Sequence, residues 1–385
     1  MFDPDTLTEI RDAIRNCTTD QINLLDEIRR AVRQIIPNVR TIRPRSTTSI
    51  SLVASDGGNN KLVFDPFYVQ VVRVVDSYGK SLCFDAVSPT TDTDKLSKKQ
   101  FDTQGNPQTS LGLMMKDLGV KTLNELSHMI PSGQQIRDDP NSVSRSWVLV
   151  YREIYEWAVL YERICHTKFA TDTLIVRDGL LRSKKFRGDI FRQWRILVES
   201  SIERIRQEDR RKVFLVGLAK HSKVIDRYGL ALALEGVFPA GEAKFVRVPR
   251  DLESQAYIWQ EWARGEETEN LGKELPKFVA GDMYFVRFGP RAGDPVWAVD
   301  ILSSQVERDQ EIFSYLLADA RDGFPIPFYP KCLQKADEYA QVVDLDLDIL
   351  QSEVFKSLRQ NLAPKEQAAL DSFRMMPDLT GRRYD

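Results

Sequence analysis

Apolar residues near the amino terminus recur at the spacing of an amphipathic helix. Between residues 5 and 37 they fall on one face, with charged and polar residues between them. The pattern is interrupted around residues 17–20, where the chain reads Cys-Thr-Thr-Asp. We therefore predict two helices, which together form an arm (1–47) ahead of the core.

Three apolar runs of strand type follow the arm. They lie at residues 49–55, 67–76 and 80–87, and a Tyr-Gly-Lys turn joins the last two. Connections this short favour antiparallel pairing of successive strands. Residues 88–110 are polar and interrupted by proline and glycine, which predicts a loop, whereas the pattern over 111–167 is mainly helical.

From residue 172 onward, strand and helix patterns alternate. In chain order we predict strand 172–177, helix 187–209, strand 212–218, a helix or turn at 222–235, strand 244–248, helix 251–264, strands 282–288 and 295–302, and helices 304–320 and 331–344. Three antiparallel strands followed by such alternation are typical of a mixed sheet flanked by helices. The predicted fold class is therefore α/β.

Two of the predicted strands are followed by an Asp-Gly dipeptide. Asp56 follows the run 50–55, and Asp178 follows the run 173–177. An Asp-Gly at the end of a buried strand presents a carboxylate at the edge of the sheet, and the glycine permits a sharp exit. Either dipeptide alone is more often a plain turn. As a pair, the two aspartates are candidate ligands of one divalent cation.

A third carboxylate is available on the helix that leads into the second of these strands. Glu153 and Glu156 are three residues apart and lie on one helix face. Either one is a candidate ligand, and the alternative is that both are ordinary surface glutamates. Carboxylate oxygens suit Mg²⁺ and Mn²⁺, and two such ions about 4 Å apart can hydrolyse a phosphodiester.

The balance of charge differs between the whole chain and one segment. A net charge of −2 argues against indiscriminate coating of nucleic acid, but residues 177–212 carry twelve basic residues and six acidic ones. A basic surface beside a carboxylate site suits a polyanion such as DNA, which makes Arg182, Lys184 and Lys185 candidate DNA contacts. The alternative is a solvated helix of mixed charge.

Proline residues mark a further segment near the carboxyl end. Residues 324–330 read Phe-Pro-Ile-Pro-Phe-Tyr-Pro, which places Tyr329 at the entrance of a helix. Asp337 follows about two helical turns later. A tyrosine hydroxyl can orient a phosphate or a water molecule, and an aspartate can join a metal cluster. The alternative is an ordinary helix start.

Several classes of protein are disfavoured because their motifs are missing. The chain has no phosphate-binding P-loop, so it is not expected to be its own ATP-driven motor. His128, His166 and His221 suggest neither a catalytic triad nor a zinc site, and four widely spaced cysteines suggest reduced thiols. No apolar stretch is long enough to span a membrane and no signal-peptide pattern is present, so we expect a cytoplasmic protein.

Taken in order along the chain, these motifs resemble the NurA family of nucleases, which are RNase H-like. The resemblance rests on residues 54–58, the Arg/Glu-rich helix at 151–163, residues 174–181, residues 216–220, and Tyr329-Pro330 followed by Leu333 and Ala336. It implies an RNase H-like mixed sheet flanked by helices, behind an amino-terminal helical arm. The nuclease domain would cover 48–345 with a helical insertion at about 88–167, and a helical tail would cover 346–385.

The resemblance also implies an activity and its partners. Such proteins are manganese- or magnesium-dependent DNA nucleases, with 5′-to-3′ exonuclease activity and endonuclease activity on single strands. They are typically dimers and work with a HerA-type hexameric ATPase. The setting is either the processing of DNA ends for repair or the destruction of phage DNA.

The resemblance assigns roles to individual residues. Asp56 and Asp178 are implied metal ligands, Glu156 is the first choice for the third ligand, and Glu153 is the reserve. Tyr329 is an implied active-site partner. Lys220 is implied to contact phosphate, and the alternative is a solvated loop lysine.

The chain departs from the family at one position. Family members often carry a histidine where this chain has Asp337. An aspartate can bind a metal but cannot act as a cationic acid at neutral pH. This departure favours a rival hypothesis, a catalytically inactive scaffold or DNA-binding subunit of an ATPase complex. A third hypothesis is an RNA nuclease of the same fold, since no motif reads a 2′-hydroxyl.

Overall fold

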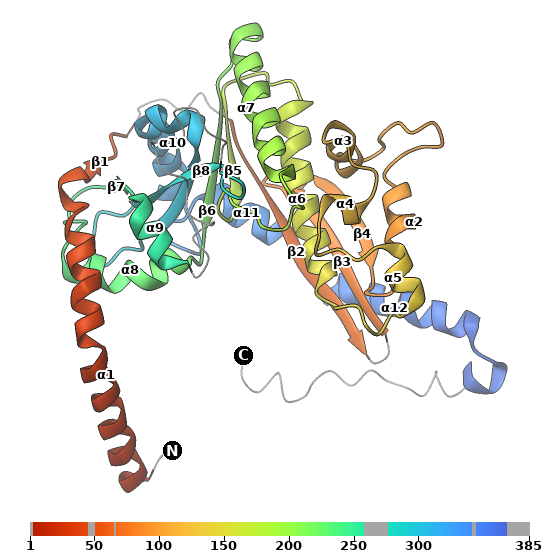
Figure 1. Ribbon diagram of the computed structural model, residues 1–385, viewed down its shortest axis with the longest axis horizontal. Helices are drawn as coiled ribbons and strands as arrows, with labels where there is room; N and C mark the ends of the chain where they lie inside the picture. Colours follow the sequence, from red (N-terminus) through yellow and green to blue (C-terminus); the bar gives the residue numbers. More distant parts are fainter. Residues whose placement is uncertain (1–2, 45–50, 65–66, 258–275, 341–343, 368–385) are drawn as a thin grey trace.

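Nine strands form one mixed sheet at the centre of the computed structural model (Figure 1), which describes residues 3–44, 51–64, 67–257, 276–340 and 344–367. The order across the sheet is β1-β7-β8-β9-β6-β5-β2-β3-β4. The strands are β1 (Arg40–Thr41), β2 (Ser51–Phe64), β3 (Phe67–Asp76), β4 (Ser81–Val87), β5 (Thr173–Asp178), β6 (Val213–Ala219), β7 (Lys244–Arg247), β8 (Gly281–Arg287) and β9 (Trp297–Leu302).

Five of these strands have the RNase H-like arrangement. β2, β3 and β4 pair antiparallel in succession, as the short connections predict. β5 then lies parallel to β2 on its other side, and β6 lies parallel to β5. The remaining strands extend the sheet beyond β6 through antiparallel pairs. The predicted α/β class with a mixed, RNase H-like sheet is therefore confirmed.

Helices cover both faces of the central strands. Ile175, Val213 and Leu215 face α6 (Trp147–Cys165) and α7 (Ile190–Glu208) in one apolar core. Their neighbours Leu174 and Val176 face α10 (Asp309–Arg321) and α11 (Lys331–Ala340) in a second core. Alternate residues of a strand point to opposite faces, so strands buried on both sides need continuous apolar runs. This is why β5 and β6 read as uninterrupted apolar sequence.

The helical insertion lies between β4 and β5 and covers one end of the sheet (Figure 1). It contains α2 (Thr93–Lys98), α3 (Ser110–Asp117), α4 (Leu123–Leu126), α5 (Gly133–Asp138) and α6. The prediction of a loop over 88–110 is partly wrong because α2 lies within it. Asp92 caps this helix by accepting hydrogen bonds from the backbone N–H groups of Asp94 and Lys95.

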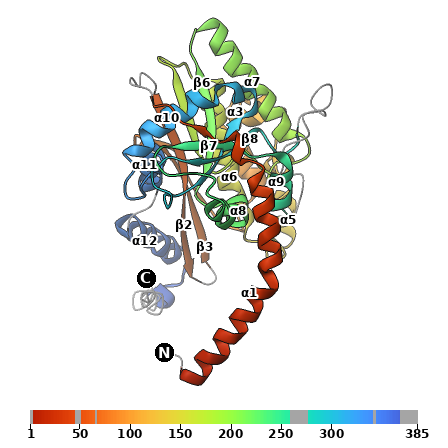
Figure 2. The same cartoon turned by 90° about the vertical axis from the view of Figure 1, so that its left-hand side faces the viewer.

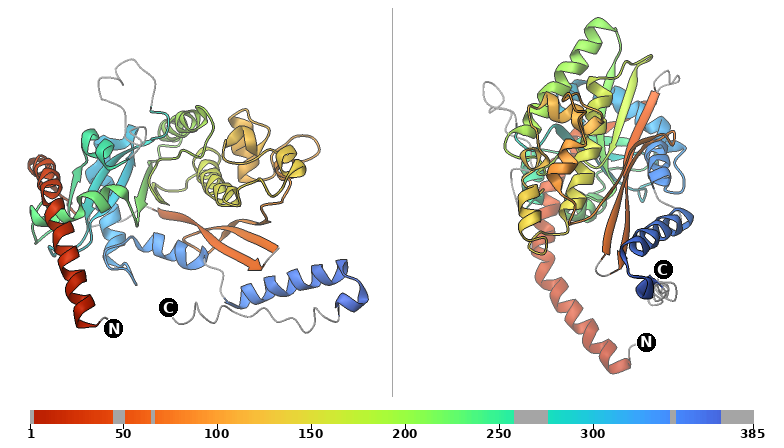
Figure 3. Two further views of the ribbon diagram at one scale, coloured as in Figure 1. Left: turned by 60° about the horizontal axis from the view of Figure 1, so that its bottom comes forward. Right: turned by 90° about the vertical axis from the view of Figure 1, so that its right-hand side faces the viewer.

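The two helices predicted for the arm (1–47) are one helix, α1 (Pro4–Arg33), and the predicted break at 17–20 is wrong. The end of the predicted arm is not ahead of the core, because β1 pairs with β7 and belongs to the sheet. Thr18 and Thr19 satisfy their hydroxyl groups inside the helix, by donating to the carbonyls of Ile14 and Arg15 at 2.8 and 2.9 Å. Such bonds remove the polar groups' need for a turn. The first half of α1 projects away from the body of the molecule (Figures 2 and 3).

Two further boundaries differ from the sequence prediction. β2 continues through Asp56, Gly57 and Gly58, because β3 pairs with all three through Val75, Val74 and Arg73. The first Asp-Gly is therefore inside a strand and not at its end. The helix predicted at 304–320 begins with a 3₁₀ turn, Ser303–Arg308, before α10.

The remaining helices are α8 (Lys223–Leu234), α9 (Arg250–Ala256) and α12 (Asp344–Asn361). The helix predicted at 251–264 is described only as far as α9, since 258–275 lie outside the described residues. All four cysteines are free thiols. Over the part of the chain that the structure describes, no helix combines the length and apolar character needed to cross a membrane.

The second half of α1 is fixed to the body by ion pairs to α8. The side chains of Arg29 and Arg33 each lie 2.6 Å from a carboxylate oxygen of Glu235. Hydrogen bonds from Arg33 and then Arg29 lower the pKa of Glu235 from 4.5 to about 2. A lowered pKa stabilises the folded state above pH 4.5, and this contribution is lost as the pH falls toward 2.

We expect Glu235→Gln to loosen the docked half of α1 at pH 7, because both arginines lose the ionised partner that joins them to the body of the molecule. The protection of the amides of residues 25–35, measured against their intrinsic exchange rate at the same pH, should fall, and the wild-type chain should show the same loss only when the pH approaches 2. Glu27→Gln, an exposed change on the same helix, serves as the control. Equal exchange in Glu235→Gln and the wild type at pH 7 would contradict this expectation.

Candidate active site

A cleft of about 430 Å³ opens where β5 and β6 end. Four parts of the chain line it: the middle of α6, the turn after β5, the junction between β6 and α8, and the residue that follows α9. The lining residues are Arg152, Glu153, Glu156, Arg177, Asp178, Gly179, Leu180, Arg182, Ala219, His221, Ser222, Lys223 and Tyr257. Three predicted carboxylates, Glu153, Glu156 and Asp178, therefore lie in the wall of one cleft.

Asp178 is the last residue of β5, as the Asp-Gly pattern predicts. Gly179 follows with φ +97°, a conformation that favours glycine, and its N–H donates to the carbonyl of Leu218 at 2.8 Å. Arg177 closes the turn by donating to the carbonyl of Leu180 at 3.0 Å. The turn therefore holds the Asp178 carboxylate, 22% exposed, at the cleft.

Gly217 of β6 lets this turn lie directly against the sheet. A Cβ atom at residue 217 would lie 2.5 Å from the carbonyl oxygen of Gly179 and 2.8 Å from the backbone nitrogen of Leu181. These are backbone atoms, so the turn must move to make room.

We expect Gly217→Ala to lower the free energy of unfolding by about 1–3 kcal/mol and to displace Asp178. Urea unfolding measures the first effect, and any nuclease activity measures the second. Gly229→Ala is the matched control, because its nearest neighbour would be Cγ2 of Ile225 at 3.7 Å. That variant lies within α8 and should gain up to about 1 kcal/mol in helix propensity. If Gly217→Ala has the same free energy of unfolding as the wild type, the turn after β5 does not lie as close to residue 217 as described.

The backbone register brings the two Asp-Gly dipeptides to the same level. Ser55 of β2 pairs with Arg177 of β5 in parallel, and the next residues on the two strands are Asp56 and Asp178. Adjacent strands lie about 4.8 Å apart, so the two backbones are neighbours at this level. The side chain of Asp56 lies outside the described part of the structure, and its role as a ligand stays a prediction.

The two candidate glutamates of α6 differ in their surroundings. One oxygen of Glu156 lies 3.3 Å from Nε of Arg152, and the other lies 3.9 Å from the guanidinium of Arg177. Arg177 itself stacks 4.2 Å above the ring of Trp157. Glu153 instead accepts a hydrogen bond from Ser183 at 3.4 Å. Glu156 therefore belongs to the cluster around the β5 turn.

Lys220 bridges two aspartates that are far apart in sequence. Its Nζ lies 3.3 Å from Asp178 and 3.0 Å from Asp337. This ammonium group also lies 5.7 Å from the ring centre of Tyr329, which is fully buried and packs against Trp297. Tyr329, at the entrance of α11, and Asp337, two turns later, thus both lie near the same lysine. The structure places Tyr329 behind this lysine rather than on the open surface.

The prediction that Arg182 contacts DNA is wrong. The Arg182 side chain is 1% exposed, and it binds Asp300 through two hydrogen bonds of 2.8 Å and Glu253 through one of 2.8 Å. The positive charge of Arg182 is therefore balanced by two buried carboxylates inside the protein. Of the other two predicted DNA contacts, Lys184 lies 5.5 Å from the ring centre of Phe278, and Lys185 lies 4.0 Å from a carboxylate oxygen of Glu153 at the cleft.

The donor set of the cleft suits a hard divalent cation. Asp178 and Glu156 offer carboxylate oxygens, which are the ligands that Mg²⁺ and Mn²⁺ prefer. Nearby ammonium and guanidinium groups balance these charges in the structure. Among the side chains that the structure describes, no three His, Cys, Asp or Glu gather closely enough to hold a metal, and Asp56 is not among those side chains.

Sequence reasoning missed several residues of the cleft wall. Arg152 and Arg177 position Glu156 and the turn, and His221, which was set aside, is exposed at the cleft. Two signals were available. Arg177 directly precedes the Asp-Gly dipeptide, and Arg152 stands four residues before Glu156, the spacing of neighbours on a helix.

No protein-family model and no curated protein matches this chain. Among solved structures, it is similar to the NurA nuclease from Sulfolobus solfataricus, with 16% identity, a TM-score of 0.40, and coverage of 92% of this chain and 98% of that one. It is also similar to a NurA bound to dAMP and manganese, with 12% identity, a TM-score of 0.38, and coverage of 93% and 99%. Both of these solved structures carry the name of the nuclease family that the motifs of this chain resemble.

Proposed function

We propose that this protein is a metal-dependent deoxyribonuclease whose active site is the cleft at the end of β5. The observation that carries the proposal is the convergence of Asp178 and Glu156 on this cleft, with Asp56 level with Asp178 in the register. Carboxylates collected at one place repel one another unless cations balance them. The motifs that resemble the NurA family contribute the same residues.

The proposed metal ligands are Asp56, Asp178 and Glu156, with Glu153 as the alternative third carboxylate. They would hold Mn²⁺ or Mg²⁺, and a two-metal arrangement is expected. Such ions supply activation of the attacking water and stabilisation of the leaving oxygen in phosphodiester hydrolysis.

Basic residues at and beside the cleft would bind and orient the DNA backbone. Lys220 pairs with Asp337 as well as with Asp178, so it would keep a partner beside the cleft if Asp178 bound a cation. The lysine then has a donor to offer to a phosphate oxygen. Lys223 and His221 are exposed on the same wall and add a positive charge and a group that can carry a proton. The buried ring of Tyr329 lies 5.7 Å from the ammonium group of Lys220 and helps to position it.

The test is the degradation of end-labelled DNA. Single- and double-stranded substrates carrying a 5′ or a 3′ label are incubated with the full chain and Mn²⁺, Mg²⁺ or EDTA. The proposal expects cleavage with a divalent cation and none with EDTA. The two labels also report the proposed 5′-to-3′ exonuclease polarity, and a circular single strand reports endonuclease activity. Absence of cleavage under every condition would refute the proposal.

The proposal also includes partner proteins. No P-loop is present in the sequence, so energy for moving along DNA would come from a HerA-type hexameric ATPase. The arm offers a docking surface for this ATPase or for a second copy of the chain, because Ile14 and Ile22 are 60% and 47% exposed on α1. Light scattering of the wild type and Ile14→Glu tests the dimer. The activity would serve DNA end processing or defence against phages.

The second candidate function is an inactive scaffold of an ATPase complex. One observation favours it: the cleft carboxylates are paired with lysine and arginine, and Asp337 shares Lys220 with Asp178. A catalytically inactive site would keep these ion pairs without binding a metal. Calorimetry with Mn²⁺ separates the two, because a scaffold would bind DNA but no cation at Asp178.

A further inference from the structure

A second cavity lies in the helical insertion, away from the cleft. Its volume is about 670 Å³, within the range of about 300–1,000 Å³ typical of ligand pockets. It is lined by the end of α2, the loop 101–107, the end of α3 and the turn before α4. We propose that this cavity binds one nucleotide of a single-stranded nucleic acid, with its base against Phe101 and its phosphates on three lysines.

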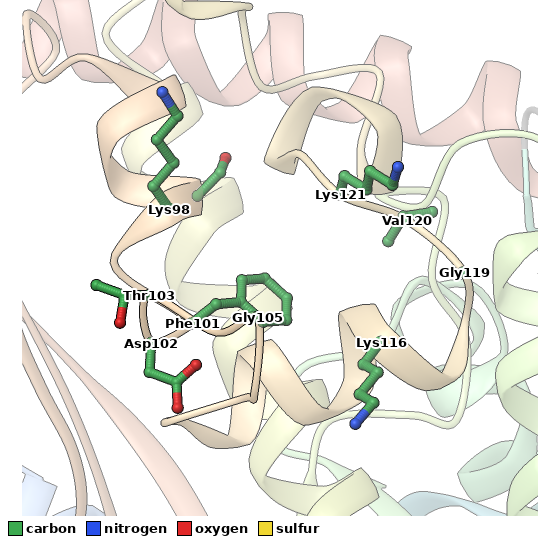
Figure 4. Close-up of a pocket in the computed structure, with 10 residues that line it drawn as sticks. Lys98, Phe101, Asp102, Thr103, Gly105, Lys116, Gly119, Val120 and Lys121 are labelled. Atoms are coloured by element: carbon green, nitrogen blue, oxygen red, sulfur yellow. The ribbon is translucent and has the colours of Figure 1, made fainter.

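The chemistry of the lining supports a ligand with a flat apolar part and negative charge. Figure 4 shows the ring of Phe101 between the segments that line the cavity, with Lys98, Lys116 and Lys121 on the rim and their ammonium groups directed outward. Val120 and two glycines complete the apolar part of the wall. Aromatic rings that stack on bases, combined with lysines that contact phosphates, are characteristic of single-strand binding.

The three lysines keep their charge available for a ligand. None of their ammonium groups pairs with a carboxylate in the described part of the chain, and all three residues are exposed. Two acidic residues are near these lysines: Asp102 lines the cavity itself, and Asp117 lies next to Lys116 in the chain. Each carboxylate has hydrogen-bond partners other than the lysines. Asp102 accepts bonds from the backbone of Gln104 and Asn106, and Asp117 accepts from Tyr161 at 2.9 Å and lies 2.7 Å from His166.

The walls of this cavity are built rigidly. α3 ends in a Schellman motif, in which Gly119 (φ +70°) donates to Lys116 and Val120 donates to Met115. The next residues begin α4 through a capping box between Thr122 and Glu125. A preformed cavity loses little conformational entropy when a ligand enters.

A single strand fits this cavity better than a duplex. A base must leave its stack to reach Phe101, which an unpaired strand permits and a duplex opposes. Within the insertion, α3 packs on α6, the helix that carries Glu153 and Glu156, and Ser110 of α3 donates a hydrogen bond to Glu162 of α6. The cavity is therefore fixed to the same helix as the cleft. This inference rests on the proposed action on DNA.

The test is binding of a fluorescent dT12 strand to the full chain in EDTA, so that no cleavage interferes. Lys116→Glu and Phe101→Leu should each weaken binding roughly tenfold. Removing one lysine should also lower the slope of log Kd against log salt by about 0.7. A 2-aminopurine in the strand should be quenched by the wild type and not by Phe101→Leu.

Lys95→Glu is the matched control, because Lys95 is exposed on α2 but does not line the cavity. Equal weakening in this control would mean a diffuse positive surface and would overturn the inference. So would unchanged binding in both cavity variants, or displacement of dT12 by an acidic peptide at equal concentration. If the variants bind normally while DNA is still cut, the cavity proposal fails alone. If binding depends on the cavity but DNA is never cut, the proposed nuclease fails alone.

Discussion

Asp178→Asn is expected to lower metal-dependent DNA cleavage by at least about 100-fold, because the variant keeps the shape of the side chain but loses the charge that would bind a cation. Loss of a residue that merely supports a metal ligand costs about 10–100-fold, so loss of a ligand should cost more. The turn that holds Asp178 is fixed by backbone bonds and by Arg177. The variant should therefore remain folded.

The control for this experiment is Asp209→Asn, an exposed change at the end of α7 and outside the cleft. It should cleave DNA at the wild-type rate. The same assay separates the two candidate glutamates, since Glu156→Gln should resemble Asp178→Asn whereas Glu153→Gln should retain activity. Activity that survives in Asp178→Asn would place the active site elsewhere.

Arg182→Met is expected to lower the free energy of unfolding by about 3–5 kcal/mol. Asp300 and Glu253 have fully buried carboxylates that both bind this guanidinium. Without it, two negative charges remain in the interior, where water cannot screen them. Arg182 also follows closely on the Asp178 turn, so the variant should lose any activity together with stability. Urea unfolding monitored by tryptophan fluorescence measures the effect.

Two comparisons make the Arg182 result specific. Arg206→Met removes an exposed ion pair to Glu203 and should change stability by at most about 1 kcal/mol. The triple variant Arg182→Met, Glu253→Gln, Asp300→Asn removes all three charges and should recover part of the lost stability. If Arg182→Met unfolds at the same urea concentration as Arg206→Met, the buried network contributes little.

The sequence predicted most of the strands well because buried strands leave short apolar runs bounded by polar residues. β3 was predicted at its observed bounds, and β5 and β6 within one residue. The arm was predicted less well, because the polar residues at 17–20 resemble a helix end. Thr18 and Thr19 bond to their own helix instead, which composition alone does not reveal. The course of β2 through Asp56 depends on its partner β3, a long-range pairing.

The candidate site was predicted as a set of residues but not as an arrangement. Motifs identified Asp178, Glu156, Lys220 and Asp337, and the structure brings these four around β5 and β6. The basic segment was misleading, since a count of charges cannot separate Arg182, which is buried with two acids, from the exposed arginines. Burial of a charged side chain depends on partners far away in sequence, here Glu253 and Asp300.

The parallel pairing of β2 with β5 has a consequence for how the chain folds. Between these neighbours lie β3, β4 and the entire helical insertion, so the pair closes a loop of more than a hundred residues. Contacts between distant segments form slowly, because their loop entropy is lost before they gain stability. A chain emerging from the ribosome therefore holds Asp56 long before Asp178 is made. We therefore expect the cleft to form late in folding, and a chain cut short before residue 173 carries no part of β5.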